Sequence, residues 1–463
     1  MIGSTLRMLV PLVLASLAQG QSAAWSRAFG SADFDPDSAS APNRVHVLHT
    51  VEAVGGKQAL LLGGSFDRAA GTSSSGVARL DDAGYAPLGD RGIPHFGGGW
   101  DHILEQVNAV VTWDDGSGEA VYIGGRYFAE VAGSDGALLA SRDGVWEAVG
   151  GGIAIPSGGV LPEVNALAVF DDGSGEKLYA AGLFTRADSL PVSHVARWNG
   201  IAWEGVGEGL NGLVLALCVH DDGTGAALYA GGRFTQSGAT VTGRVARWNG
   251  SNWDAVGSPP TGPVRALASW NAGAGQRLVA TGKFGSAGAA PAISIATWDG
   301  ASWSALGAGL SLTTAEDNGG HALLARTEGS GQALYVGGEF TSVDGVVANN
   351  VARFDGTTWS ALSSGVDALV RDLAVADLDG AGPRLVIGGA FEFAGGEWAP
   401  RVALWDGVAL TAVAGRGFDR SVYAMAEFDD GGGRALYVGG YFRRAGKGVA
   451  RGIARWTGSG WEE

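Results

Sequence analysis

The chain has 463 residues, 80 of them glycine, and a formal net charge of −16 at pH 7. Such an acidic balance repels phosphate backbones and disfavours nucleic acid as a partner. The 16 tryptophans and the many other apolar residues exclude disorder over most of the length.

The first twenty residues have the form of an export signal. An apolar run over residues 8–18 follows the single positive charge of Arg7. Small residues then fit a cleavage site near Gly20, with cleavage after Ala24 as the alternative. The run is too short for a bilayer, which takes about 20 residues, and no later segment is long and apolar enough. We therefore predict a signal peptide over residues 1–20, a secreted or cell-surface location and no membrane span.

A unit of about fifty residues recurs along the rest of the chain. Its most regular element reads "LYAAGLF", "LYAGGRF" or "LYVGGEF", and an aromatic residue always follows two positions after the last small residue of the doublet. Self-similarity at a near-constant spacing is the signature of a repeat architecture. The element places its second glycine at Gly64, Gly125, Gly182, Gly232, Gly282, Gly338, Gly389 and Gly440.

Each copy contains four short apolar runs. In the third copy they are "VNALAVF", "KLYAAGLF", "HVARW" and "WEGVG", separated by "DDGSG", a variable loop and "NGIA". Short runs rich in Val, Leu, Tyr and Trp between Gly, Asn and Asp are typical of strands. The "DDG" and "NG" pairs suit the positive φ angles of hairpin turns. Each copy is therefore predicted to be a four-stranded antiparallel meander.

Such sheets cannot bury both faces alone, and we find no amphipathic helical segment to cover them. We therefore predict an all-β fold, an eight-bladed β-propeller of four-stranded antiparallel blades over residues 21–463. An open solenoid of stacked sheets is the alternative. A strand over residues 24–30 is expected to complete the last blade and close the ring. The expected blades span residues 43–104, 105–162, 163–211, 212–262, 263–316, 317–367, 368–418 and 419–463.

Large side chains are expected to face each other across the turn between the third and fourth runs. In "WNGIAW" they are Trp198 and Trp203, which we assign to the core rather than to a ligand platform. The aromatic residue after the glycine doublet is expected to wedge between blades, and the doublet to allow close approach or a bulge. The other expected pairs are Leu80–Tyr85, Ser141–Trp146, Trp248–Trp253, Trp298–Trp303, Phe354–Trp359, Trp405–Leu410 and Trp456–Trp461.

The combination of "LYVGG" with a following "VARWNGxxW" resembles the kelch-type propeller repeat. It is also similar to repeats of secreted bacterial propeller proteins and fungal cell-surface polarity proteins. The resemblance extends over residues 43–463 and departs from many kelch repeats in a shorter aromatic-to-Trp spacing and a longer period. It implies a propeller, but kelch-like propellers serve both as protein-binding modules and as scaffolds of copper-dependent sugar oxidases.

The loops differ between the two expected faces of the fold. Turns after the first and third runs are short and repetitive, whereas loops after the second and fourth runs vary. If the first run lies nearest the axis, the variable loops share one face, and such loops usually carry binding residues. We expect any ligand site on this face near the axis. The candidates are His95, Trp100, Asp101, His102, Glu316, Asp317 and His321.

Catalytic and metal signatures are sparse. The only thiol, Cys218, lies in a first run and is expected to pack as a small hydrophobe, which argues against the cross-linked copper site of the sugar oxidases. We find no HExxH, GxSxG or Walker motif. The best calcium candidates are Asp377 and Asp379 in "DLDGAG", although the loop lacks the later acidic ligands that calcium requires.

These observations favour a secreted or cell-surface module that binds a protein or a glycan without catalysis and without a cofactor. The alternative is an extracellular carbohydrate-active enzyme, a hydrolase, lyase or oxidase, with its site on the variable-loop face. A purely structural module is a third interpretation. Metal analysis and a screen against polysaccharides would separate the first two.

Overall fold

The computed structural model shows an all-β protein. Among the described residues one short 3-10 turn, Val149–Gly151, is the sole helical element. The strands pair antiparallel throughout the sheets described below. The structure describes residues 44–462 except 54–56, 66–67, 70–71, 74–76, 82–83, 88–105, 127–136, 143–144, 156–161, 272, 274, 314–317, 329–330, 377–381, 414–416, 430–433, 441, 447, 451–452 and 457–459.

Successive segments form sheets in which the strands follow one another in chain order, as predicted. We number these sheets along the chain. Sheet I contains β1 (Arg44–Ala53), β2 (Lys57–Ser65), β5 (Val77–Asp81) and β6 (Gly84–Pro87); sheet II β7 (Gln106–Asp114), β8 (Glu119–Arg126), β9 (Leu138–Arg142) and β10 (Val145–Ala148); sheet III β12 (Glu163–Asp171), β13 (Glu176–Leu183), β16 (Val195–Trp198) and β17 (Trp203–Gly205); sheet IV β18 (Val214–Asp221), β19 (Ala226–Gly232), β22 (Val245–Trp248) and β23 (Trp253–Ala255). Sheet V contains β24 (Val264–Asn271), β25 (Gln276–Gly282), β28 (Ile295–Trp298) and β29 (Trp303–Ala305); sheet VI β31 (Gly319–Glu328), β32 (Gly331–Val343), β34 (Val351–Phe354) and β35 (Trp359–Ala361); sheet VII β36 (Val370–Ala376), β37 (Arg384–Gly389), β40 (Val402–Trp405) and β41 (Leu410–Ala412); sheet VIII β42 (Val422–Asp429), β43 (Arg434–Gly440), β46 (Ile453–Trp456) and β47 (Trp461–Glu462).

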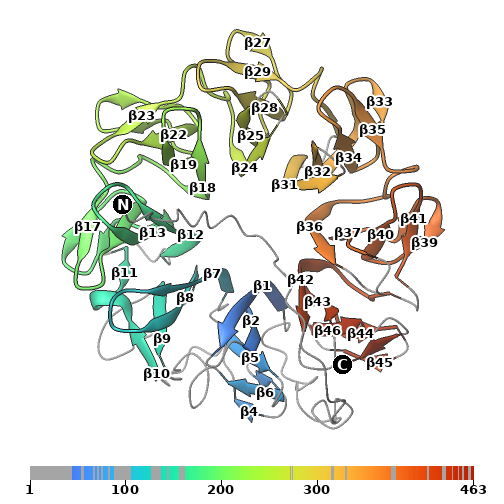
Figure 1. Cartoon of the computed structure of the whole chain (residues 1–463), viewed down its shortest axis with the longest axis horizontal. Coiled ribbons are helices and arrows are strands. Elements are labelled where there is room, and N and C mark those ends of the chain that lie inside the picture. Colours follow the sequence, from blue (N-terminus) through green and yellow to red (C-terminus); the bar gives the residue numbers. More distant parts are fainter. Residues whose placement is uncertain are drawn as a thin grey trace, which may run out of the picture.

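The sheets stand around a common axis, each with its first strand innermost, which is the architecture of a β-propeller (Figure 1). Strand β1 contacts β42 and β43 as well as β7, so the first sheet touches both the last and the second. An open stack would keep its first and last sheets apart. The closing strand expected over residues 24–30 lies outside the described residues, and the outermost strand of sheet VIII is β47.

Short ribbons lie between the second and third strands of the sheets and mark one face of the propeller. In sheet III the ribbon comprises β14 (Arg186–Ala187) and β15 (Leu190–Pro191), and β14 pairs with β11 (Ile153–Ala154), which enters from sheet II. The same link recurs between later sheets, through β30 (Leu310–Leu312) and β32 and through two isolated bridges. The ribbons and the connections between sheets therefore share a face, as expected for the variable loops. The other ribbons are β3 (Arg68–Ala69) with β4 (Thr72–Ser73), β20 (Gln236–Ser237) with β21 (Thr240–Val241), β26 (Ser286–Ala287) with β27 (Ala290–Pro291), β33 (Val346–Val347) with the end of β32, β38 (Phe393–Ala394) with β39 (Glu397–Trp398), and β44 (Arg444–Ala445) with β45 (Gly448–Val449).

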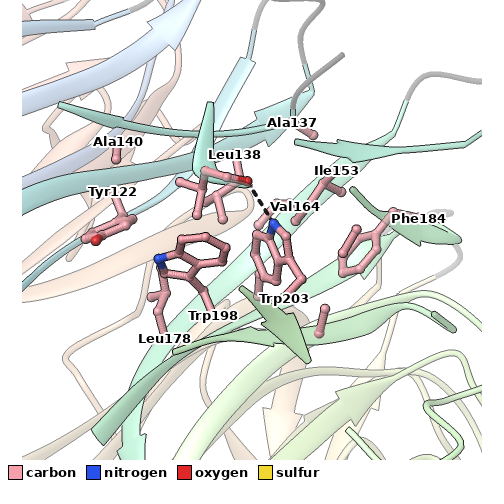
Figure 2. Packing of buried hydrophobic residues seen from close by; sticks show 14 of the residues in the cluster. Tyr122, Ala137, Leu138, Ala140, Ile153, Val164, Leu178, Phe184, Trp198 and Trp203 are labelled. Carbon is pink, nitrogen blue, oxygen red and sulfur yellow. Dashed lines mark hydrogen bonds between the residues drawn. The ribbon is translucent and has the colours of Figure 1, made fainter. Parts of the chain in front are cut away.

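The predicted cross-strand pairs are confirmed in every sheet. Trp198 lies opposite Trp203 with ring centroids 5.6 Å apart, and both are buried with Phe184, which directly follows β13 (Figure 2). The indole of Trp203 also donates a hydrogen bond of 2.8 Å to the carbonyl of Val149, in the 3-10 turn that follows the last strand of the preceding sheet. Four tryptophans at this position thus fill the core and bond to the preceding module, whereas the buried indole nitrogen of Trp461 in sheet VIII has no partner among the described residues. The equivalent bonds are Trp253 to Val206, Trp303 to Val256 and Trp359 to Leu306.

The two glycines of the doublet have different neighbours. A Cβ on Gly231 would lie 2.8 Å from Cγ1 of Val264 in the next sheet, so this glycine lets the sheets approach. A Cβ on Gly232 would collide with the carbonyl oxygen of Leu213 in the same sheet. Both roles expected for the doublet therefore occur, one at each glycine.

One interface reverses this arrangement. Between sheets V and VI, Thr281 replaces the first glycine, and Gly320 stands where the other interfaces have valine. A Cβ on Gly320 would overlap the hydroxyl oxygen of Thr281, which is fully buried. At this interface the glycine is therefore on the inner strand of the later sheet, rather than on the second strand of the earlier one.

Candidate functional site

Every innermost strand carries a β-bulge at the same place, close to the end where the chain enters from the preceding sheet. In β12 the pairing with β13 shifts between Val164 and Ala166, which leaves Asn165 as the extra residue. Bulges redirect side chains and often lie next to functional sites. We call the extra residues the bulge ring: His46, Asn108, Asn165, Leu215, Arg265, His321, Arg371 and Tyr423.

The innermost strands keep solvent-accessible surface around the axis. In sheet III, residues 165–169 of β12 are half-buried, whereas residues 177–182 of β13 are buried. Most inner-strand side chains are aliphatic, so the wall they form is largely apolar. The bulge ring differs because all of its members except Leu215 carry hydrogen-bonding side chains.

Two asparagines of the ring are held by contacts between sheets. The Asn108 amide donates to Oδ1 of Asn165 at 3.1 Å and to Oε1 of Glu163 at 3.3 Å. Asn165 in turn donates to the carbonyl of Val214 at 3.2 Å. This chain of bonds runs across sheets II, III and IV and fixes both amides.

The next four sheets place two cations, a histidine and a tyrosine on the ring. Nη1 of Arg265 donates to the carbonyl of Asn318 at 2.8 Å, which joins sheet V to the connection entering sheet VI. The Arg371 guanidinium carbon lies 4.9 Å from the ring centroid of Tyr423, a cation–π contact between sheets VII and VIII. His321 lies between these arginines on β31 and is half-buried. This half of the ring is therefore rich in hydrogen-bond donors.

Asp372 follows the bulge in sheet VII, where most other inner strands carry alanine. Its carboxylate accepts hydrogen bonds from the backbone N–H of Leu373 at 2.9 Å and of Met425 at 2.8 Å, the second on β42. Burial raises the pKa of this carboxyl to about 7, against the opposing effect of these two hydrogen bonds. Asp372 therefore changes charge near neutral pH, next to Arg371.

Only one of the site residues predicted from sequence falls on described parts of this face. His321 belongs to the bulge ring and lies within inner strand β31 rather than in the connecting loop. The remaining candidates, and both calcium candidates, lie outside the described residues: His95, Trp100, Asp101, His102, Glu316, Asp317, Asp377 and Asp379. Within the part of the chain that the structure describes, no group of three or more His, Cys, Asp or Glu residues could hold a metal ion.

The sequence analysis missed the other ring members, although a signal was present. Inner runs repeat a pattern of Val, one variable residue, then Ala and Leu, as in "VNALAVF", "VLALCVH" and "VRALASW". The variable residue is the bulged one. Variation at one place in an otherwise repetitive strand is expected where a side chain serves a site rather than the core.

The acidic turns on the opposite face have a structural role. Asp171 caps its turn by accepting the backbone N–H groups of Gly173 and Gly175, as predicted for a hairpin. Asp172 accepts hydrogen bonds from Tyr179 at 2.8 Å and from Trp248 of the next sheet at 3.0 Å. It also forms an ion pair with Arg197. The carboxylate oxygens of Asp172 are thus engaged by protein donors.

Cys218 is half-buried on β18 and packs against the core between sheets IV and V, as expected for a small hydrophobe. Burial raises the pKa of its thiol to about 12. The thiol is therefore protonated at neutral pH and is a poor nucleophile.

The comparisons with known proteins agree with the fold. Residues 334–357 match a family described as a domain of unknown function (DUF5122) beta-propeller. No curated protein matches the chain. No helix in the described part is long and apolar enough to cross a membrane.

Solved structures that resemble the chain share little sequence with it. The extracellular domain of the one component system BT4673 from B. thetaiotaomicron is 13% identical, with a TM-score of 0.31 over 91% of this chain and 47% of that chain. BBS1N in complex with ARL6DN is 12% identical, with a TM-score of 0.35 over 72% of this chain and 88% of that chain. The Niastella koreensis GH74 enzyme is 12% identical, with a TM-score of 0.22 over 90% of this chain and 76% of that chain. The chain spans about half the length of the first of these structures.

Proposed function

We propose that the chain is an exported, kelch-like propeller with eight blades that binds a protein or a glycan without catalysis. The bulge ring carries the proposal. It gathers polar side chains from successive sheets at the same level of the axis, on the face of the variable connections. Several of these side chains are held in place by contacts between sheets, and such preorganised polar groups bind a ligand at low entropic cost.

The test is a binding screen of the full chain against glycans and extracellular proteins, followed by ring variants. Asn165→Ala and Arg371→Ala should weaken capture of whatever partner the screen finds. Gln236→Ala, an exposed substitution on the ribbon of sheet IV, is the matched control and should bind as the wild type. Equal binding by the ring variants and the control would contradict a site at the ring.

A second function rests on the place of Asp372 next to Arg371, directly after the bulge of β36, together with the pKa of about 7 to which burial raises its carboxyl. A group with such a pKa suits general acid–base work near neutral pH, and a carbohydrate-active enzyme would use it beside Arg371 and Tyr423. Polysaccharide turnover by the wild type that disappears in Asp372→Asn would support this function. Absence of turnover with a wide polysaccharide panel and no bound metal supports the binding module.

Export is tested by sequencing the N-terminus of the protein recovered from the medium or the cell surface. The proposal expects a mature chain that begins near residue 21 or residue 25. A protein that retains Met1 inside the cell would contradict it.

A further inference from the structure

The charge of the bulge ring is opposite to that of the chain as a whole. The chain holds 47 Asp and Glu against 31 Lys and Arg, yet none of the ring residues is acidic and two are arginines. An acidic protein that concentrates cations at one place on its axis creates a local attraction for negative groups.

Arg371 is the clearest member of this group. Its guanidinium lies against the ring of Tyr423 in a cation–π contact, which restricts its position. The Nε atom is buried and has no hydrogen-bond partner among the described residues. Within the same part of the chain, the salt bridges include none made by Arg371.

The neighbouring carboxylate of Asp372 does not accept a hydrogen bond from Arg371. Asp372 directs its two oxygens to the backbone N–H groups of Leu373 and Met425. A buried donor of a charged group without an acceptor is costly, so such an atom in a folded protein calls for an explanation. The buried Nε atoms of other arginines, Arg247 and Arg401 among them, share this state. The donors that Arg371 offers to a ligand are therefore its two Nη groups, which no hydrogen bond or salt bridge among the described residues engages.

We propose that the half of the bulge ring formed by Arg265, His321, Arg371 and Tyr423 binds a carboxylate group of the ligand. The planar guanidinium of Arg371 can present two parallel N–H donors to the two oxygens of a carboxylate. His321 and Arg265 lie on the two preceding inner strands, and the ring of Tyr423 contacts the guanidinium from the following one. This inference rests on the proposed binding function and names the group that the site recognises.

A carboxylate can be carried by a sugar acid or by an acidic peptide, and the experiment separates these sources. Binding of the full chain is measured by calorimetry with a trisaccharide of galacturonic acid, the neutral trisaccharide of galactose and a peptide of three glutamates. Binding of either acidic probe, but not of the neutral one, supports the proposal and identifies the source. Failure of both acidic probes to bind at about 10 mM overturns it.

Variants assign the binding to the ring. Arg371→Ala should lower the affinity for the acidic probe about ten- to hundredfold, because a hydrogen bond between charged groups is lost. Arg371→Lys should retain the charge but recover only part of the affinity, since lysine lacks the two-pronged geometry. Arg326→Ala is the matched control, because this arginine lies on inner strand β31 toward the opposite face and pairs with Glu328. It should bind as the wild type.

Folding is checked by near-ultraviolet circular dichroism for each variant. If Arg371→Ala fails to fold, the lysine variant and the salt dependence of the wild type decide the question, because a charge-paired site weakens as salt screens it. Equal affinity of folded Arg371 variants and wild type overturns the carboxylate site. A neutral partner that binds through Asn108 and Asn165 would also overturn the carboxylate site, but it would leave the proposed binding function intact.

Discussion

Two interfaces between sheets solve the same packing problem in opposite ways. Between sheets IV and V, Gly231 faces Val264, whereas between sheets V and VI, Thr281 faces Gly320. At both contacts one of the two facing residues is glycine, and this glycine can stand on either side. Close packing in protein interiors explains why one side must shrink when the other grows.

The largest expected effect comes from Gly320→Val. The valine that suits other interfaces would here collide with the buried Thr281 and should lower the free energy of unfolding by about 3 kcal/mol. Adding Thr281→Gly restores the arrangement of sheets IV and V and should recover most of the loss. Urea unfolding of both single variants and the double variant measures the coupling, and simple additivity would contradict the volume argument.

The second effect concerns the turn between β12 and β13. Asp172→Ala leaves Tyr179, Trp248 and Arg197 without their shared acceptor. It should lower the free energy of unfolding by about 2 to 3 kcal/mol. Asp222→Ala is the matched comparison in sheet IV, where the carboxylate accepts from Tyr229 and pairs with Arg247 at 3.7 Å. We expect a smaller loss there, and unfolding curves that rank the two variants the other way would contradict this account.

The same turn should also contribute to acid sensitivity. Burial alone would raise the pKa of Asp172, but hydrogen bonds from Ser174, Trp248 and Tyr179 and the charge of Arg197 lower it well below the usual range. A lowered pKa stabilises the fold above the ordinary aspartate pKa, near 3.9, and this contribution is lost as the pH falls further. Asp172→Asn should therefore show a weaker loss of thermal stability on acidification than the wild type.

A third effect is expected at Asp372, where stability should fall as the pH rises, the opposite of the dependence expected at Asp172. Its pKa of about 7 lies above the unfolded value, so its contribution to stability is complete below about pH 4 and is lost as the pH rises toward 7. Asp372→Ala introduces the residue that most other inner strands carry and removes this dependence. Melting temperatures from about pH 5 to about pH 8 should converge for the two proteins, and parallel curves would contradict the raised pKa.

The smallest effect is expected on the ribbon of sheet VII. Phe393 and Trp398 face each other across β38 and β39 but remain 44% and 51% exposed. Replacing them with Gln and Val, the residues at these places in sheet IV, should change the free energy of unfolding by less than about 0.5 kcal/mol. A loss comparable to that of Gly320→Val would show that ribbons contribute to the core as the sheet interfaces do.

The sequence predicts the repeated parts of this molecule well because each has a local signal. Strand order, the pairing of Trp198 with Trp203 and the variable-loop face all follow from turns and apolar runs within one copy. The exchange of Thr281 and Gly320 has no local signal, since it joins residues of two copies. The contact of Arg371 with Tyr423 likewise depends on a bulge in each of two adjacent strands, which periodicity does not reveal.

Four indole bonds made by fourth-strand tryptophans point toward the preceding sheet, whereas Trp270 on inner strand β24 donates forward to the carbonyl of Gln332 in the next sheet. Trp203, Trp253, Trp303 and Trp359 each donate to a carbonyl made earlier in synthesis. A chain that emerges from its N-terminal side would meet each acceptor already in place, so assembly can proceed one module at a time behind the growing end. The contact of β1 with β42 can form only after the last module has arrived.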